Sequence, residues 1–146
     1  MKLLFVDAGN YCRSPVAEIV ARTLAGAAGL ADKYQFGSAG LKDKHVGDHA
    51  DPRSIEVCAQ RGYDLTAFRC REITNEDFRA YDVVLAMDRD NLLQLQSRRP
   101  ADAATDLRLF LGAGEVPDPY YGGVEGFAMM MHQIETGVRR LLGITS

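Results

Sequence analysis

The chain has few cysteines, little net charge and no long apolar run, and each deficit excludes a class of function. The formal net charge of −3 at pH 7 excludes broad electrostatic attraction to nucleic acid or to an anionic membrane. No apolar run approaches the roughly 20 residues that a membrane-spanning helix needs. The apolar start of the chain soon meets a charged residue, so we interpret it as a core strand and not as a signal peptide.

Cysteine is represented by Cys12, Cys58 and Cys70 alone. An odd count without the paired spacing of a zinc site predicts reduced thiols rather than a disulfide framework or a metal centre. Reduced thiols are the rule in the cytoplasm, so we expect a cytoplasmic protein. Cys58 falls on the apolar face of an expected helix and is interpreted as a core residue.

The residues that are present are typical of a single α/β domain over residues 1–146, long enough to bury a substantial core. Apolar runs predict four strands, at residues 3–6, 34–38, 81–87 and 107–111. Apolar spacing and N-cap residues predict helices that begin near residues 14, 51, 74 and 88, and a last helix that ends near residue 143. Strands that alternate with helices predict a parallel sheet covered by helices on both faces.

The first expected strand runs into a short loop, residues 7–14, that is suited to receive an anion. Ser14 and Pro15 are favourable as the N-cap and first residue of the next helix. Such a loop points backbone N–H groups at one spot, with the positive end of the helix dipole behind them. Arg13 can hold two oxygens of a phosphate with its planar guanidinium. Parallel sheets bind ligands at the carboxyl ends of their strands, where this loop lies.

The loop resembles the signature of the low-molecular-weight protein tyrosine phosphatases, V-C-x-G-N-x-C-R-S-P. Residues 6–15 read V-D-A-G-N-Y-C-R-S-P, so every motif position matches except the catalytic cysteine, where Asp7 stands. Further matches in the same order extend the resemblance over essentially the whole chain: S-A-G at 38–40, A-D-P-R at 50–53, R-E-I-T at 71–74, M-D at 87–88 and D-P-Y at 118–120. The resemblance implies a three-layer fold with a four-stranded parallel sheet and a phosphate-binding loop after the first strand.

The resemblance also implies a phosphatase mechanism that needs no cofactor and no metal. In the family a thiolate attacks phosphorus, and water then hydrolyses the phosphoenzyme. Arg13 would hold the phosphoryl oxygens, and Asp118 would protonate the leaving oxygen and later activate water. The phosphate-binding residues would be Ala8, Gly9, Asn10, Tyr11, Cys12, Arg13 and Ser14, with Asn10 and Ser14 bracing the loop through side-chain hydrogen bonds. Tyr11, Lys44, Tyr120 and Tyr121 would form the substrate pocket, for a phosphorylated protein or a small aryl phosphate.

Asp7 is the main departure from the family pattern. A carboxylate is longer than a thiolate and a poorer nucleophile toward phosphorus, and it can accept the loop N–H groups itself and face Arg13. We therefore expect a phosphate dianion to be excluded by charge and by volume, and phosphatase activity to be absent or very low. An aspartyl-phosphate route stays open chemically, because carboxylates act as covalent nucleophiles in other phosphotransferases.

A second function that stays open is a pseudophosphatase, which would bind a partner protein through the polar loop 41–50 and perform no chemistry. In this loop Lys44 stands where the family usually has an aromatic residue. Outside it, Phe68 stands where the family often has a histidine. We interpret His45 and His49 as solvated loop residues rather than metal ligands.

A third function is a redox protein similar to the related arsenate reductases. In that case Cys12 would pair with Cys58 or Cys70 in a disulfide. The absence of a cysteine at position 7 argues against this function.

Overall fold

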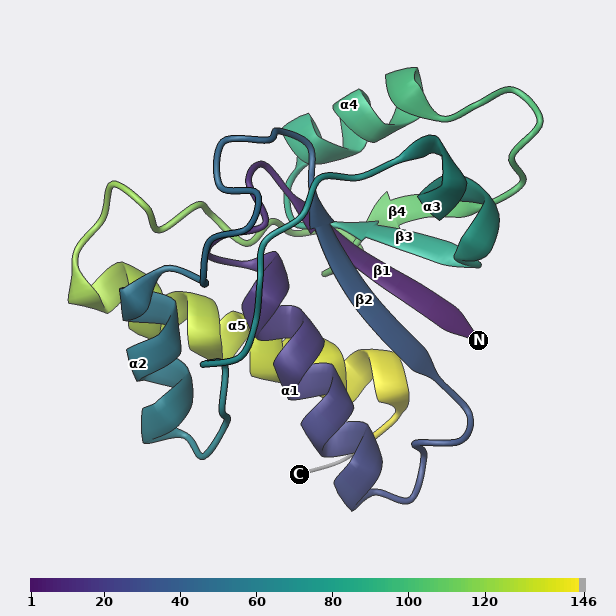
Figure 1. Cartoon of the computed structure of the whole chain (residues 1–146). Helices are drawn as coiled ribbons and strands as arrows, with labels where there is room; N and C mark the ends of the chain where they lie inside the picture. The colour runs from purple at the N-terminus through teal and green to yellow at the C-terminus, as the bar shows by residue number, and fades with distance from the viewer. Residues whose placement is uncertain (145–146) are drawn as a thin grey trace.

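The structure, a computed structural model, describes residues 1–144 and is built around one parallel sheet (Figure 1). Within these residues the strands are β1 (Lys2–Asp7), β2 (Gln35–Gly40), β3 (Val83–Ala86) and β4 (Asp106–Leu109), in the spatial order β2-β1-β3-β4. The helices are α1 (Ser14–Ala27), α2 (Pro52–Gln60), α3 (Asn75–Ala80), α4 (Arg89–Arg98) and α5 (Val124–Leu142). Every strand pair is parallel, so the predicted three-layer α/β fold is confirmed. The prediction of one domain over 1–146 includes residues 145–146, which lie outside the described residues.

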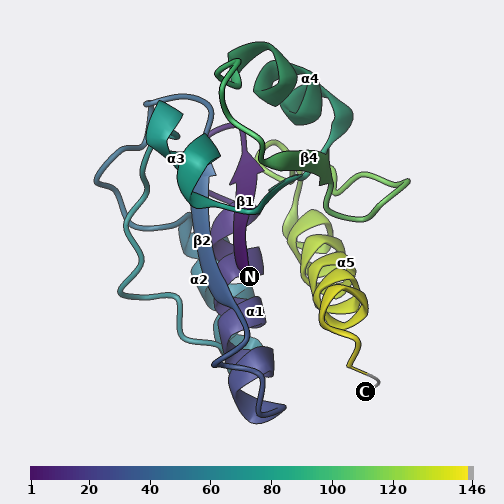
Figure 2. The ribbon, with the colours of Figure 1, turned by 90° about the vertical axis from the view of Figure 1, so that its right-hand side faces the viewer.

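Side chains of β1 alternate between two apolar cores, one on each face of the sheet. Leu3 and Phe5 belong to the core that α1 and α5 cover, whereas Leu4 and Val6 belong to the core beneath α3 and α4. Figure 1 shows these helices on opposite sides of the sheet, and Figure 2 shows β1 and β2 running side by side. Burial on both faces explains the unbroken apolar run, and each such side chain stabilises the fold by about 1.5–3 kcal/mol.

Three predicted helix starts are confirmed by side-chain caps. Asp51 accepts the backbone N–H of Arg53 at the start of α2, and Asp88 accepts that of Asn91 at the start of α4. Thr74 caps α3 in a reciprocal capping box, in which its hydroxyl and the carboxylate of the third helical residue each accept a backbone N–H. These caps set the directions in which the chain leaves the sheet.

The predicted start of α1 is wrong by one residue. The N-cap is Arg13, and Ser14 and Pro15 are already helical. The Ser14 hydroxyl does not cap the helix, because it accepts a hydrogen bond from Asn10 Nδ2 at 2.8 Å. The backbone N–H groups of the N-cap Arg13 and of the first helical residue, Ser14, donate instead to the carboxylate of Asp7, the last residue of β1. A residue of the strand therefore satisfies donors at the start of the helix that have no partner within the helix.

The ends of β2 and β4 also differ from the prediction. β2 continues to Gly40 rather than ending at residue 38, because its last residues pair with Val6 and Asp7 of β1. β4 ends at Leu109 rather than at residue 111, because the chain turns there and Leu111 forms an isolated bridge with Gly114. Among residues 1–144, no helix has both the length and the apolar character that crossing a membrane requires.

Candidate active site

The loop between β1 and α1 is held in one shape by the side chain of Asn10. Asn10 has a positive φ of 56°, and its amide donates to the hydroxyls of Ser14 and Ser38 at 2.8 and 3.1 Å. Its carbonyl oxygen accepts the backbone N–H of Arg71 at 2.8 Å. The predicted bracing hydrogen bond between Asn10 and Ser14 is therefore present. The further bonds to Ser38 and Arg71 attach the loop to β2 and to the segment before α3.

Gly40, the last residue of β2, lets the loop pack directly against the sheet. A Cβ atom at this position would lie 2.6 Å from the backbone carbon of Gly9 and 2.7 Å from the backbone nitrogen of Asn10. Both contacts are shorter than van der Waals packing allows, and both involve backbone atoms that cannot turn away. The glycine of the S-A-G motif thus provides space for the loop.

The carboxylate of Asp7 occupies the base of the loop. Asp7 is 2% exposed. Its Oδ1 accepts the backbone N–H of Asn10 at 2.6 Å, and its Oδ2 accepts the backbone N–H groups of Arg13 and Ser14 at 3.1 and 2.8 Å. The expectation that Asp7 accepts the loop N–H groups is therefore confirmed. The loop N–H groups, which could hold the anionic group of a ligand, therefore bind the carboxylate of Asp7 instead.

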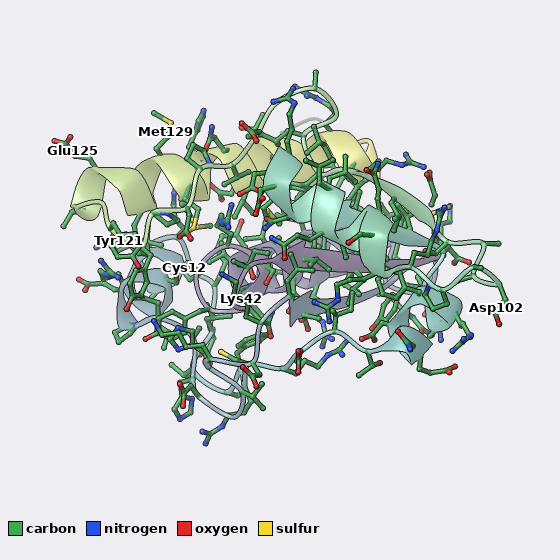
Figure 3. All side chains as sticks on the ribbon, turned by 90° about the horizontal axis from the view of Figure 1, so that it is seen from above. Cys12, Lys42, Asp102, Tyr121, Glu125 and Met129 are labelled. Atoms are coloured by element: carbon green, nitrogen blue, oxygen red, sulfur yellow. The ribbon has the colours of Figure 1, made fainter. Side chains whose placement is uncertain are left out.

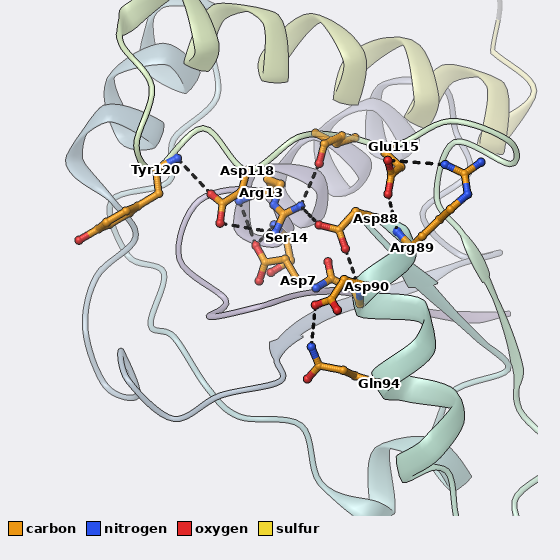
Figure 4. Close-up of polar contacts among 12 residues, drawn as sticks. Asp7, Arg13, Ser14, Asp88, Arg89, Asp90, Gln94, Glu115, Asp118 and Tyr120 are labelled. Atoms are coloured by element: carbon orange, nitrogen blue, oxygen red, sulfur yellow. Dashed lines mark hydrogen bonds and ion pairs between the residues drawn. The ribbon is translucent and has the colours of Figure 1, made fainter.

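Arg13 lies among three carboxylates and is 2% exposed. Its Nη1 donates to Asp88 at 2.8 Å and to the carbonyl oxygen of Val116 at 2.9 Å, and its Nη2 lies 3.8 Å from Asp118 (Figure 4). Its Nε has no hydrogen-bond partner among the described residues. Burial alone would lower the pKa of this guanidinium, but Asp7, Asp88 and Asp118 outweigh it and raise the pKa. Arg13 is thus permanently charged and already bound.

Asp118 lies on the loop that leads into α5 and is the solvent-accessible carboxylate of this group. Its side chain is 44% exposed, and its Oδ1 accepts the backbone N–H of Tyr120 at 3.0 Å. Its Oδ2 faces Arg13 without a close hydrogen bond. The structure therefore brings Asp118 to the loop that holds Asp7 and Arg13, more than 100 residues earlier in the chain, as the resemblance implies.

An aromatic wall lines the cleft above the loop. The rings of Tyr11 and Tyr120 are 6.1 Å apart, and the ring of Tyr121 meets that of Tyr120 edge to face at 4.9 Å. The ammonium group of Lys44 and the guanidinium of Arg53 lie 5.7 and 5.4 Å from the centre of the Tyr120 ring. Tyr121 is 92% exposed, so it borders the mouth of the cleft.

The cleft has a volume of about 220 Å³ and contains most of the predicted site residues. Its lining residues are Asp7, Ala8, Gly9, Tyr11, Cys12, Arg13, Lys42, Lys44, His45, Asp118, Tyr120 and Tyr121. Asn10 and Ser14 are buried behind it, where they brace the loop. All four predicted pocket residues, Tyr11, Lys44, Tyr120 and Tyr121, therefore share one cleft.

His45 is part of the site, and its interpretation as a solvated residue is wrong. Its ring stacks on the ring of Tyr11 at 3.7 Å with an interplanar angle of 4°, and its side chain is only 16% exposed. The ring also packs against Gly9: a Cβ atom added to Gly9 would lie 3.3 Å from Cδ2 of His45. His49 is exposed, as predicted. Among the described residues, no three His, Cys, Asp or Glu side chains are arranged to hold a metal ion.

Asp88 is a second site residue that sequence reasoning missed. Its predicted role as the cap of α4 is confirmed, but its other oxygen also accepts from Arg13 across 75 residues of sequence. The M-D match after the third strand was the available signal, because it places an acid at the carboxyl end of a strand beside β1. Arg53 was missed as well, although the A-D-P-R match contains it.

The three cysteines are free thiols and are all buried. Burial and then the nearby Asp51, whose Oδ2 lies 3.6 Å from the sulfur, raise the pKa of Cys12 far above its ordinary value. Burial also raises the pKa values of Cys58 and Cys70 to about 12. The core position predicted for Cys58 is confirmed by its 0% exposure. Near neutral pH these thiols are protonated and unreactive.

Comparison with known proteins decides the family. The family described as low molecular weight phosphotyrosine protein phosphatase matches residues 2–145. The chain belongs to this family. It is 37% identical to a low molecular weight protein-tyrosine-phosphatase of Streptomyces coelicolor, over 97% of this chain and 91% of that protein.

Two solved structures of the family extend the comparison. A protein tyrosine phosphatase from Entamoeba histolytica, with Hepes in its active site, superposes with a TM-score of 0.91 at 37% identity, covering 97% of this chain and 94% of the other. Wzb from Vibrio vulnificus, in complex with benzylphosphonate, superposes with a TM-score of 0.86 at 26% identity, covering 97% of each chain. The cleft described above therefore lies on the scaffold that these family members share.

Proposed function

We propose that this family member carries Asp7 at the position of the catalytic cysteine and that it hydrolyses phosphate monoesters very slowly or not at all. The observation that carries the proposal is the set of three backbone hydrogen bonds that the Asp7 carboxylate accepts at the base of the loop. These donors would otherwise bind the oxygens of a phosphoryl group. The carboxylate takes both the space and the donors of the substrate dianion, and it repels that dianion by its charge.

Neither of the other nucleophiles that the sequence offers fits the reaction. The oxygens of Asp7 are turned into the loop by their hydrogen bonds, which argues against attack on phosphorus and against the aspartyl-phosphate route. The thiol of Cys12 is buried and is protonated because of its raised pKa. The raised pKa values of the three cysteines also argue against an arsenate-reductase-like redox function.

The remaining machinery supports descent from an active enzyme. In the proposal Arg13 is the oxygen-holding residue and Asp118 the general acid and base, as in the family. Ala8, Gly9, Asn10, Tyr11, Cys12, Arg13 and Ser14 form the phosphate-binding loop, and Tyr11, Lys44, Tyr120 and Tyr121 form the substrate pocket. The substrate of the parent activity is a phosphorylated protein or a small aryl phosphate. The benzylphosphonate complex of Vibrio vulnificus Wzb supports this class of substrate.

The second candidate is a pseudophosphatase that binds a partner protein. It is favoured by the hydrogen bonding of the loop, since three of its backbone N–H groups are satisfied by Asp7 without a ligand. The segment 41–50 presents the exposed side chains of Lys42 and Lys44 beside the cleft and would contact the partner. The three free thiols support a cytoplasmic location for either function.

Hydrolysis of p-nitrophenyl phosphate by the unchanged chain and by Asp7→Cys tests the proposal. We expect no measurable turnover by the unchanged chain and turnover by the variant, because a thiolate at position 7 supplies the nucleophile and its single sulfur atom leaves loop N–H donors for the phosphoryl oxygens. Asp102→Asn is the matched control, since it removes an exposed carboxylate distant from the cleft. Turnover by the unchanged chain would refute the proposal. Failure of a folded Asp7→Cys variant would leave the binding protein as the function.

A further inference from the structure

Once Asp7 closes the loop, the inner part of the cleft has the opposite electrostatic character from a phosphate site. The carboxylates of Asp88 and Asp118 face the guanidinium of Arg13 at 2.8 and 3.8 Å, and the charge of Asp7 also acts on it and raises its pKa. Asp88 pairs with Arg13 at 2.8 Å, whereas Asp118 stays 3.8 Å away and is 44% exposed. Within this group the three carboxylates outnumber the one guanidinium, and Asp118 is the acid that a ligand can reach, although Lys42 and Lys44 also line the cleft.

The pKa values of Tyr11 and Cys12, two groups of the cleft, are both raised, as nearby negative charge would raise them. Burial raises the pKa values of Tyr11 and Cys12, and neighbouring carboxylates raise them further. Asp51 acts on both groups, and Asp7 and Asp118 act on Cys12. A loop that stabilises a thiolate needs a positive field, which would lower these values. The geometry of the carboxylates and the direction of these shifts thus agree.

Two cationic side chains of the chain itself already lie against the aromatic wall of the cleft. The Lys44 ammonium and the Arg53 guanidinium both lie within 6 Å of the Tyr120 ring, the range in which a cation is attracted to a ring face. Tyr11 and Tyr121 extend the same wall. Aromatic rings next to a reachable carboxylate are the usual components of a site for an organic cation.

We propose that the cleft binds an organic cation, the ammonium or guanidinium group of a single lysine or arginine side chain of a partner, with Asp118 as its counter-ion and Tyr120 as its ring contact. This inference rests on the proposed function, because it requires Asp7 to have closed the loop to phosphate. The bound cation displaces the Lys44 ammonium from the Tyr120 ring. Lys42 and Lys44, two exposed lysines of the cleft lining, repel a second basic residue, so the neighbours of the bound side chain are neutral or acidic.

Two ligands with the same ring and opposite charge test the proposal. Benzylammonium and benzylphosphonate are titrated into the unchanged full-length chain at pH 7 and low salt, and binding is measured by calorimetry. We expect benzylammonium to bind at least tenfold more tightly. Benzylphosphonate makes the comparison demanding, because an anion could accept a hydrogen bond from Nε of Arg13, which has no partner among the described residues. Equal or tighter binding of benzylphosphonate overturns the proposal, and so does the absence of benzylammonium binding.

Two substitutions assign the binding to Asp118. Asp118→Asn keeps the shape of the side chain and removes its charge, and we expect it to weaken benzylammonium binding at least fivefold. Asp102→Asn removes one exposed carboxylate at the opposite end of the molecule from Cys12 and Tyr121, and we expect it to leave binding unchanged (Figure 3). Equal effects of the two variants would show that benzylammonium is held by the overall charge of the protein and not by Asp118, and would overturn the proposal.

The binding experiment and the activity experiment fail independently. Cation binding is measured on the unchanged chain and needs no turnover. If Asp7→Cys proves inactive while benzylammonium still binds, the parent phosphatase activity fails and the cation site stands. If Asp7→Cys hydrolyses aryl phosphates but the unchanged chain does not bind benzylammonium, the cation site fails and the proposed function stands.

Discussion

The backbone N–H of Ser14 donates a 2.8 Å hydrogen bond to Oδ2 of Asp7, and this bond joins the end of β1 to the start of α1. In a phosphate-binding loop the donors at a helix start are left for the ligand. Here they are satisfied within the chain. The site and the stability of the fold are therefore coupled through one carboxylate, and substitutions of Asp7 test both.

Asp7→Ala should destabilise the protein. The substitution leaves three backbone N–H groups at the base of the loop without their acceptor. Because entering water can replace part of the lost bonding, we expect the free energy of unfolding to fall by about 2–4 kcal/mol in all, rather than by the full cost of three unpaired donors. Urea unfolding measures this loss. Asp106→Ala, at an exposed carboxylate, is the control and should change stability by less than about 0.5 kcal/mol.

Phosphate should rescue the Asp7→Ala variant. With the carboxylate removed, the loop regains free donors and the space for an external anion, so the folded state gains binding energy that the unfolded state lacks. We expect phosphate at a hundred times its dissociation constant to restore about 2.7 kcal/mol to the variant. The unchanged chain should gain nothing beyond the effect of sodium chloride at the same ionic strength. An equal gain by both proteins would show that Asp7 does not occupy the anion position.

Gly40→Ala should damage the site through packing alone. The new Cβ atom would lie 2.6 Å from backbone of Gly9, so the loop has to move away from β2. We expect a loss of about 1–3 kcal/mol in the free energy of unfolding. Gly26→Ala is the matched control, because nothing lies within 4 Å of its Cβ position inside α1. There we expect a gain of about 0.5–1 kcal/mol, and equal effects at both positions would contradict the argument.

The fold and part of the site could be predicted because their signals are local. A strand buried on both faces needs consecutive apolar residues, and Leu3 to Val6 supply them. The behaviour of Asp7 followed from chemistry alone, since a carboxylate surrounded by loop N–H groups accepts them. The predicted start of α1 is wrong because the favourable cap residue, Ser14, is used instead to hold Asn10.

The parts that were missed depend on residues distant in sequence. Asp88 binds Arg13 only because β3 lies next to β1, and neither residue alone indicates the other. The stack of His45 on Tyr11 depends on where the polar segment 41–50 folds back, which its composition does not determine. A cap and a strand can be predicted from a few neighbouring residues, whereas a charge pair needs the arrangement of the whole sheet.

Asp118→Asn in the Asp7→Cys background should separate general acid catalysis from phosphate binding. If Asp118 protonates the leaving oxygen, kcat falls by about 10²–10⁴ while KM changes little. The loss should be larger for phenyl phosphate than for p-nitrophenyl phosphate, because the more basic phenolate needs the proton more. A loss that is the same for both substrates would assign Asp118 a structural role instead.

Stability should fall as the pH rises above 9, because the folded protein keeps its thiols protonated. Burial raises the pKa of Cys58 from 9.0 to about 12, and burial raises that of Cys70 equally. Above pH 9 the unfolded chain releases these protons and the folded chain retains them. The contribution is therefore intact below pH 9 and is lost between pH 9 and 12, by up to about 1.4 kcal/mol per pH unit for each thiol.

Cys58→Ala isolates one of these protons. Urea unfolding from pH 8 to 10.5 under reducing conditions gives the slope of the free energy of unfolding against pH. The substitution lowers stability at every pH because it leaves a cavity. Above pH 9, however, the free energy of unfolding of the variant should fall less steeply with pH than that of the unchanged chain. The difference in slope should reach up to about 1.4 kcal/mol per pH unit, which corresponds to one proton. Val20→Ala creates a cavity in the same core and should keep the original slope. If Cys58→Ala and Val20→Ala retain identical slopes, the folded protein does not hold Cys58 protonated.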